Sequence, residues 1–152
     1  MPVIPLIIQT PDDKPLVKVV NQPIANPAAG AGFSYIVPVG YRTRLISIFM
    51  QFVADANVAD RFLVFTFETP TGIICRLTHA VAVTTGQTAT FQFHNGTLAA
   101  VISPTNLNHI NPFPAEITLE EGDSINVNVT GIQVGDQFSL INMHLLSQFV
   151  AE

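Results

Sequence analysis

The chain has 152 residues, of which 48% are hydrophobic and only 11% are Asp, Glu, Lys or Arg. Ordinary soluble domains carry about 25% charged residues, so this chain has less than half the usual charge for keeping a surface in water. The net charge of −5 and the six scattered Lys and Arg residues argue against nucleic-acid binding, which needs clustered positive charge. We therefore expect a protein that hides part of its exterior against copies of itself or a larger assembly.

The same composition argues against several other classes of protein. A single cysteine, Cys75, excludes an internal disulfide and a multi-cysteine zinc site. Apolar runs such as Leu45–Met50 are far shorter than the roughly 20 residues of a spanning helix, so we expect no membrane partner. The apolar N-terminal run lacks a basic leader and is interrupted by Pro2 and Pro5, so we expect no signal peptide and synthesis in the cytoplasm.

Residues 1–30 are predicted to form an extended, proline-rich N-terminal arm. They hold six of the eleven prolines, which fix φ and remove backbone donors, so neither a helix nor a central strand is expected. Their apolar content argues against disorder and predicts an arm that lies on its own body or on a neighbour. The arm residues predicted to make this contact are Val3, Ile4, Leu6, Ile7, Ile8, Leu16, Val17 and Val19.

Residues 31–152 are predicted to form an all-β body. In chain order we expect strands over 33–39, 42–54, 61–68, 73–77, 79–83, 88–94, 116–119, 124–130 and 137 to about 150. Perfect alternation in 125–130 indicates one wet and one buried face, whereas 42–54 carries apolar residues on both faces and is expected to be buried on both sides in its middle. Short strands separated by turn signals indicate an antiparallel β-sandwich or jelly roll of about eight strands.

The least regular part of the body is 97–114, which contains Pro104, Pro112 and Pro114. A loop of this length is usually functional or makes contacts. Phe113 within it has two open interpretations. It either caps an open end of the sandwich or meets another subunit.

No pattern in the chain indicates catalysis, so we expect no enzyme, no metal and no cofactor. The four histidines, His79, His94, His109 and His144, share no ligand spacing, although alternation could bring His79 and His94 together across a hairpin. Glu120-Glu121 precedes Gly122-Asp123 in a predicted turn, where solvated charge is ordinary. With two tyrosines and no tryptophan, a sugar-binding face is disfavoured.

Several turns resemble those of tailed-phage virion proteins. Val37-Pro38-Val39-Gly40 leads into a long strand, and Asp55-Ala56-Asn57-Val58-Ala59-Asp60-Arg61 leads into the next. Leu119–Ile125 and Gly135-Asp136 resemble the closing strands of the same proteins. The resemblance covers about 33–68 and 116–140.

The resemblance implies a small jelly-roll capsid decoration (cement) protein on the virion surface, made in the host cytoplasm. Such a protein is expected to form a homotrimer, to bind the major capsid protein and to bridge capsomers, with its arm reaching an adjacent subunit. The alternative is a receptor-binding or fibre-tip module of a phage tail that recognises host surface glycans. A third hypothesis is a cupin-like or sugar-modifying enzyme. The sequence lacks the cluster of two histidines and a glutamate that cupins carry.

Overall fold

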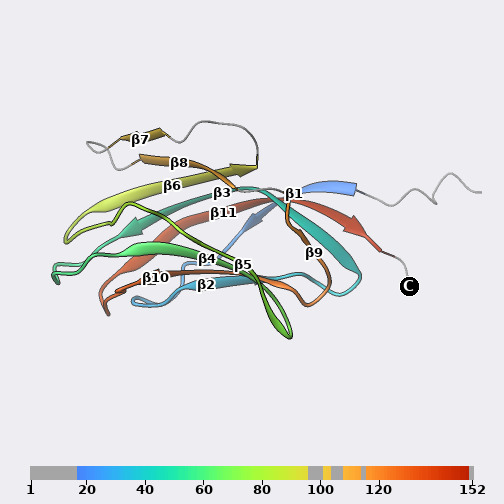
Figure 1. Cartoon of the computed structure of the whole chain (residues 1–152), viewed down its shortest axis with the longest axis horizontal. Helices are drawn as coiled ribbons and strands as arrows, with labels where there is room; N and C mark the ends of the chain where they lie inside the picture. The colour runs from blue at the N-terminus through green and yellow to red at the C-terminus, as the bar shows by residue number, and fades with distance from the viewer. Residues whose placement is uncertain (1–16, 96–100, 104–107, 114–115, 151–152) are drawn as a thin grey trace, which may run out of the picture.

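The computed structural model describes residues 17–95, 101–103, 108–113 and 116–150. These residues form eleven strands and no helix, arranged as two sheets packed face to face (Figure 1). The β-sandwich predicted from alternation and turn spacing is confirmed. No segment of the described ranges is a helix of the length and hydrophobicity needed to span a membrane.

The larger sheet has seven strands, and all of its pairs are antiparallel except β6 with β8. Their order across the sheet is β1 (Val17–Pro23), β11 (Gln137–Phe149), β3 (Tyr41–Val53), β6 (Thr88–Asn95), β8 (Asn108–Phe113) and β7 (Val101–Ser103), with β9 (Thr118–Leu119) attached to β3. The smaller sheet is antiparallel and has the order β2 (Phe33–Ile36), β10 (Ser124–Thr130), β4 (Phe62–Thr69) and β5 (Gly72–Thr78).

Aromatic side chains from both sheets fill the space between them. Phe33 on β2 meets Phe138 on β11 edge to face at 5.2 Å, and Phe138 lies 4.9 Å from Phe52 on β3. Further along, Phe65 on β4 packs against Phe93 on β6 at 4.6 Å. These contacts place β2 opposite β11 and β4 opposite β6, so burial of aromatic area joins the two sheets.

Strand β1 comes from the predicted arm. Residues 17–23 pair with β11 along their whole length and form one edge of the seven-stranded sheet. The single proline of the strand, Pro23, is its last residue, which is a position that a sheet edge tolerates. This part of the arm therefore lies on its own body.

Strands β7 and β8 occupy the segment predicted to be irregular. β7 pairs only with Asn108–Ile110 of β8, so Pro112 lies beyond it, where β8 has no second neighbour among the described residues. Proline is acceptable there, although it weakens any strand signal in the sequence. Conversely, the strand expected over 79–83 is reduced to one bridge between Val83 and Arg61.

A bulge explains why the sequence of β3 is apolar on both faces. The pairs Ser47–His144 and Leu45–Leu145 leave Ile46 as an extra residue. The extra residue reverses the alternation, so Leu45 before it and Ile48 after it both point into the core. The two predicted buried faces are one face interrupted by a bulge, and the prediction of burial on both sides is wrong, since Phe49 is exposed.

A second bulge lies on the partner strand β11. Leu140 has φ 52°, an unusual value for a branched side chain, and the register shifts there. Phe138 and Ile141 are buried on either side of it, while Leu140 itself is exposed. The two bulges place one extra residue on each strand, so β3 and β11 remain paired over most of their length.

One end of the sandwich is organised by the buried guanidinium of Arg61. Its Nε donates to Asp136 at 2.8 Å, and its Nη2 pairs with Asp55. Its remaining N–H groups donate to the carbonyl oxygens of Ala59 at 3.0 Å and Asn57 at 3.1 Å. One side chain thereby closes the β3–β4 loop and ties it to the β10–β11 loop.

Asp136 also connects the two loops, through both of its carboxylate oxygens. They accept the backbone N–H of Asp55 at 2.8 Å and of Gln133 at 2.7 Å. Burial raises the pKa of Asp136, but these bonds, the bond from Arg61 and the guanidinium charge together hold it below its ordinary value. Gly135 is required beside this group because a Cβ there would lie 2.8 Å from the Asp55 carboxylate.

Replacing Arg61 with methionine should strongly destabilise the protein. The variant Arg61→Met leaves the fully buried Asp136 without its counter-charge, which costs about 3–5 kcal/mol when one partner of a buried pair is removed. Urea denaturation measures the loss. Arg42→Met is the matched control because its pair with Glu120 is solvent-exposed, and we expect little change there. Equal stabilities of the two variants would contradict the structural role of Arg61.

Candidate contact surface

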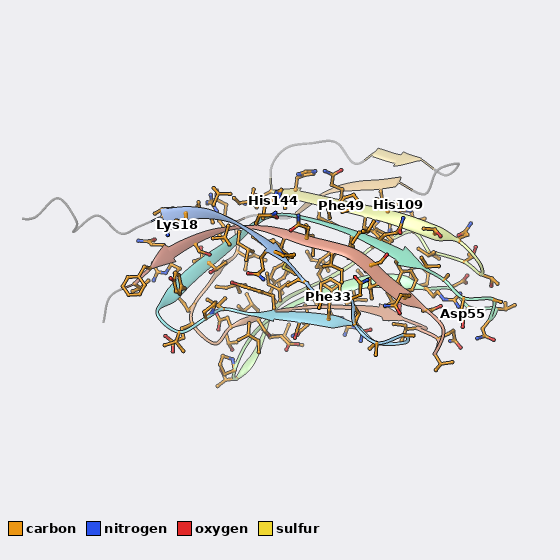
Figure 2. All side chains as sticks on the ribbon, turned by 180° about the vertical axis from the view of Figure 1, so that it is seen from behind. Lys18, Phe33, Phe49, Asp55, His109 and His144 are labelled. Carbon is orange, nitrogen blue, oxygen red and sulfur yellow. The ribbon has the colours of Figure 1, made fainter. Side chains whose placement is uncertain are left out.

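Exposed apolar side chains gather at the end of the sandwich where β1 begins. Of the thirteen large apolar residues that are exposed in the described ranges, seven lie at this end. They are Val17, Val19, Ile36, Val39, Tyr41, Phe149 and Val150, here named the arm-end patch. Figure 2 shows Lys18, next to the patch, at the opposite end from Asp55 of the Arg61 loops.

Strand register brings this patch together from distant parts of the chain. Val17 pairs with the residue before Phe149, and Phe149 pairs with Tyr41. The two aromatic rings meet edge to face at 5.6 Å. Beyond the strand, the N–H of Val150 donates to the carbonyl of Gly40 at 2.9 Å. The two ends of the described chain and the β2–β3 turn therefore lie at one end of the sandwich, with Phe149 and Tyr41 on the inner face of the larger sheet and Val17 on its outer face.

The β2–β3 turn forms part of the patch. The N–H of Tyr41 donates to the carbonyl of Pro38 at 3.2 Å, and Gly40 has φ 75°. A Cβ on Gly40 would lie 3.2 Å from the ring of Phe149. The glycine thus provides both the left-handed turn and the space for the ring, and the turn leaves Val39 77% exposed.

Acidic residues hold this turn in place. Glu121 accepts the backbone N–H of Gly40 at 2.8 Å, and Glu120 pairs with Arg42 at 2.8 Å. Asp123 accepts the N–H of Glu120 at 2.8 Å and so shapes its own turn. Each of these three carboxylates has a structural partner.

A pocket of about 360 Å³ opens beside the patch, between β1 and β2. It forms where β1 extends the larger sheet past β2, the edge strand of the smaller one. Its walls combine the only two tyrosines of the chain with Phe149, Pro38 and Val20, and its polar groups are Lys18, Gln22 and Ser147.

The inner side of this pocket is hydrogen-bonded. Ser147 and Thr43 share a bond of 3.2 Å between their hydroxyls, and Tyr35 bonds to Thr43. Burial raises the pKa of Tyr35, and the bond to Thr43 offsets part of that rise. The pocket therefore offers aromatic walls with a few fixed polar groups, which is the usual composition of a binding pocket.

The predicted contact residues fall partly within this surface. Val17 and Val19 are 51% and 68% exposed and belong to the arm-end patch. Val3, Ile4, Leu6, Ile7, Ile8 and Leu16 lie outside the described residues. Phe113 is the last residue of β8 and pairs with Asn95, and its side chain also lies outside the description.

Sequence reasoning missed the other five members of the patch. Ile36, Val39 and Tyr41 adjoin the Val-Pro-x-Gly turn, which was the available signal. Phe149 and Val150 end the last strand and gave no local sign of exposure.

The histidines are not arranged as the hairpin alternative predicted. His79 lies beside His109, with ring centroids 4.8 Å apart, while His94 pairs with Ser47 across β3 and β6. No group of three or more His, Cys, Asp and Glu residues that could hold a metal ion occurs within the part of the chain that the structure describes.

Comparison with protein-family models, with curated proteins and with solved structures finds no match to this chain. Its function is therefore argued from its own surface.

Substituting Gly40 tests whether the turn shapes the patch. Gly40→Ala should lower the free energy of unfolding by about 1–2 kcal/mol, because alanine resists a left-handed φ, with a further loss from contact with Phe149. Gly86→Ala has the same positive φ and open space around it, so it isolates the backbone effect. Gly72→Ala has neither constraint and serves as the baseline. Denaturation midpoints that fail to rank Gly40 as the most sensitive position would contradict this account.

Proposed function

We propose that this chain is a structural virion protein, a cement protein that binds the outside of a tailed-phage capsid and stabilises it by bridging capsomers. It acts as a homotrimer and contacts the major capsid protein. The observation that carries the proposal is the arm-end patch, which adjoins residues 1–16. A folded body exposes apolar residues at the start of β1, which follows an apolar, proline-rich stretch of sequence. Interface cores have this composition, since they are depleted in Lys, Glu and Asp.

Topology supports the proposal. We infer that the sandwich is a jelly roll, built from the strand sequences β1-β11-β3-β6 in one sheet and β2-β10-β4-β5 in the other. Eight strands divided between two sheets in this way are common to viral capsid and lectin domains. In this interpretation β7, β8 and β9 are an insertion between β6 and β10.

The arm is long enough for contacts with a neighbouring subunit. Sixteen residues precede β1, and an extended chain spans about 3.3 Å per residue, hence roughly 50 Å in total. An apolar extended segment can add a strand to a sheet edge or fill a groove on a partner. A protein that binds only the assembled shell stabilises that shell. The stabilisation is about 2.7 kcal/mol when the free concentration of the protein is one hundred times its dissociation constant.

A second function is favoured by one specific observation, the pocket that collects both tyrosines. A receptor-binding or fibre-tip module would use such aromatic walls to stack host glycans, with Lys18 and Gln22 as hydrogen-bonding partners. Glycan-array binding that is lost in Tyr41→Ala would favour this module over a cement protein.

Charged substitutions in the arm-end patch should prevent self-association without unfolding the body. We expect Val19→Lys combined with Val39→Lys to give monomers where the native protein gives trimers, because both side chains are exposed and lysine is costly in an interface core. Light scattering after size exclusion measures the mass. The control places the same charges at the other end, at Val58 and Val134, which are 93% and 83% exposed. Loss of trimers in the control, or their survival in the patch variant, would overturn the proposed interface.

Removal of residues 2–16 should leave a folded body that no longer reinforces a capsid. The deletion keeps β1, whose loss would expose the edge of β11. Capsids loaded with the native protein should burst at a higher temperature than bare capsids, and capsids mixed with the deletion should burst like bare ones. Equal burst temperatures for bare capsids and for capsids loaded with the native protein would contradict the proposed cement function.

A further inference from the structure

Two buried imidazoles meet between the sheets where β8 joins the sandwich. His79 is 7% exposed and His109 is 1% exposed. Their rings lie 4.8 Å apart at an angle of 70°. His109 also stacks on Phe91 at 5.1 Å, and His79 meets the same ring edge to face at 5.3 Å. Figure 2 shows His109 on the larger sheet, away from Lys18 and the arm end.

The ring nitrogens have few polar partners. Nδ1 of His79 lies 3.0 Å from the carbonyl oxygen and 3.2 Å from the nitrogen of Val81, so the backbone satisfies that atom. Nε2 of His79 and both nitrogens of His109 are buried with no hydrogen-bond partner among the described residues. A neutral imidazole tolerates such a site at a modest cost, whereas a protonated one adds a charge that nothing there compensates.

The smaller sheet brings no countercharge to the pair. β4 offers the carbonyl of Leu63, which accepts the N–H of His79. Its one charged residue, Glu68, instead accepts a bond from Asn126 and lines a hollow on the outer face together with Arg76 of β5. Cys75 of β5 is half-buried beside Phe67, four residues before His79.

The larger sheet brings no countercharge either. β6 packs Phe91 and Phe93 against His79, and its own histidine, His94, pairs with Ser47 in register. The sequence from residue 96 to residue 115 contains no Asp, Glu, Lys or Arg, so His109 is the titratable group that β8 supplies. Arg61, whose backbone bridges Val83 after this segment, has its guanidinium engaged by carboxylates at the loop end.

We propose that His79 and His109 form an acid-operated latch that holds β8 against β6 at neutral pH and releases β8 when the imidazoles are protonated. Two like charges 4.8 Å apart in an apolar site repel each other as well as losing hydration. β8 is the element that yields, because among the described residues it is joined to the sandwich by one parallel pairing with β6 and has only the short β7 on its other side. The latch does not depend on the proposed function.

The direction of the pH effect follows from the two protonation equilibria. Burial lowers the pKa of His79, and burial followed by the charge of His79 lowers the pKa of His109. The closed state therefore binds fewer protons than the open one. Closure is fully favoured above the ordinary histidine pKa of about 6.5 and weakens as the pH falls below it.

Amide hydrogen exchange on the full chain tests the latch. At pH 5.0 an exposed imidazole favours its protonated form by about 30-fold over its neutral form, so the opening constant of β8 should rise about 30-fold for one histidine and up to about 1,000-fold for both. After correction for intrinsic exchange rates, the hydrogen-bonded amides of β8, which exclude Pro112, should lose this much protection between pH 7.5 and 5.0. The amides of β10 serve as the internal reference and should stay protected.

Variants separate the buried pair from the other histidines. His79→Leu with His109→Phe should abolish the acid-induced loss of protection in β8, while His94→Gln with His144→Gln should leave it as in the native chain. If the first variant does not fold, imidazole titration of the native protein by NMR replaces it, and the buried pair should titrate in step with the opening of β8. Three results would overturn the proposal: equal protection of β8 at both pH values, simultaneous loss of protection in β10, or imidazoles that titrate near pH 6.5 while β8 stays closed.

Discussion

The sandwich depends on one buried cation. Arg61 has no exposed surface, and its N–H groups reach two carboxylates and two carbonyl oxygens from two loops that are far apart in the sequence. Its backbone simultaneously pairs with Val83. Ordered loops at that end fix where β4 and β11 begin, and hence which side chains reach the core. One of the few cationic side chains of this charge-poor protein thus connects two loops.

The two ends of the sandwich differ in what they expose. At the Arg61 end, polar atoms satisfy one another inside the protein, and the exposed valines Val58 and Val134 stand on separate loops. At the other end, exposed apolar residues come from β1, the β2–β3 turn and the end of β11, with those of β1 on the outer face of the larger sheet and Tyr41 and Phe149 on its inner face. Charged residues are present at this end too, where Arg42 pairs with Glu120 and Glu121 accepts the N–H of Gly40, so the two ends differ in exposed apolar area and not in charge. This asymmetry supports the proposed function, in which the arm end makes the principal contact.

The sequence was sufficient to predict the fold class and most strands, because a period of two and turn residues such as Asn95-Gly96 are local signals. The sequence was insufficient where the local structure depends on a strand that is distant in the chain. Bulges at Ile46 and Leu140 reverse the alternation and cannot be found without the register of the opposite strand. β8 forms despite Pro112 because β6 offers a parallel edge, and the same pairing brings His109 rather than His94 to His79. The apolar arm residues were recognised, whereas Phe149 and Val150 became part of the surface only through pairing with Tyr41 and Gly40.

Pairing between β1 and β11 also constrains when the arm-end patch can form. Val17 lies opposite Gln148, so the edge of the larger sheet joins residues separated by nearly the whole described chain. Long-range pairings of this kind form late, since the entropy of closing the loop is lost before any contact repays it. The arm-end patch needs residues 17–19, 36–41 and 149–150 in place together. A nascent or partly folded chain therefore lacks the complete patch, and under the proposed function its subunits would associate only after folding is complete.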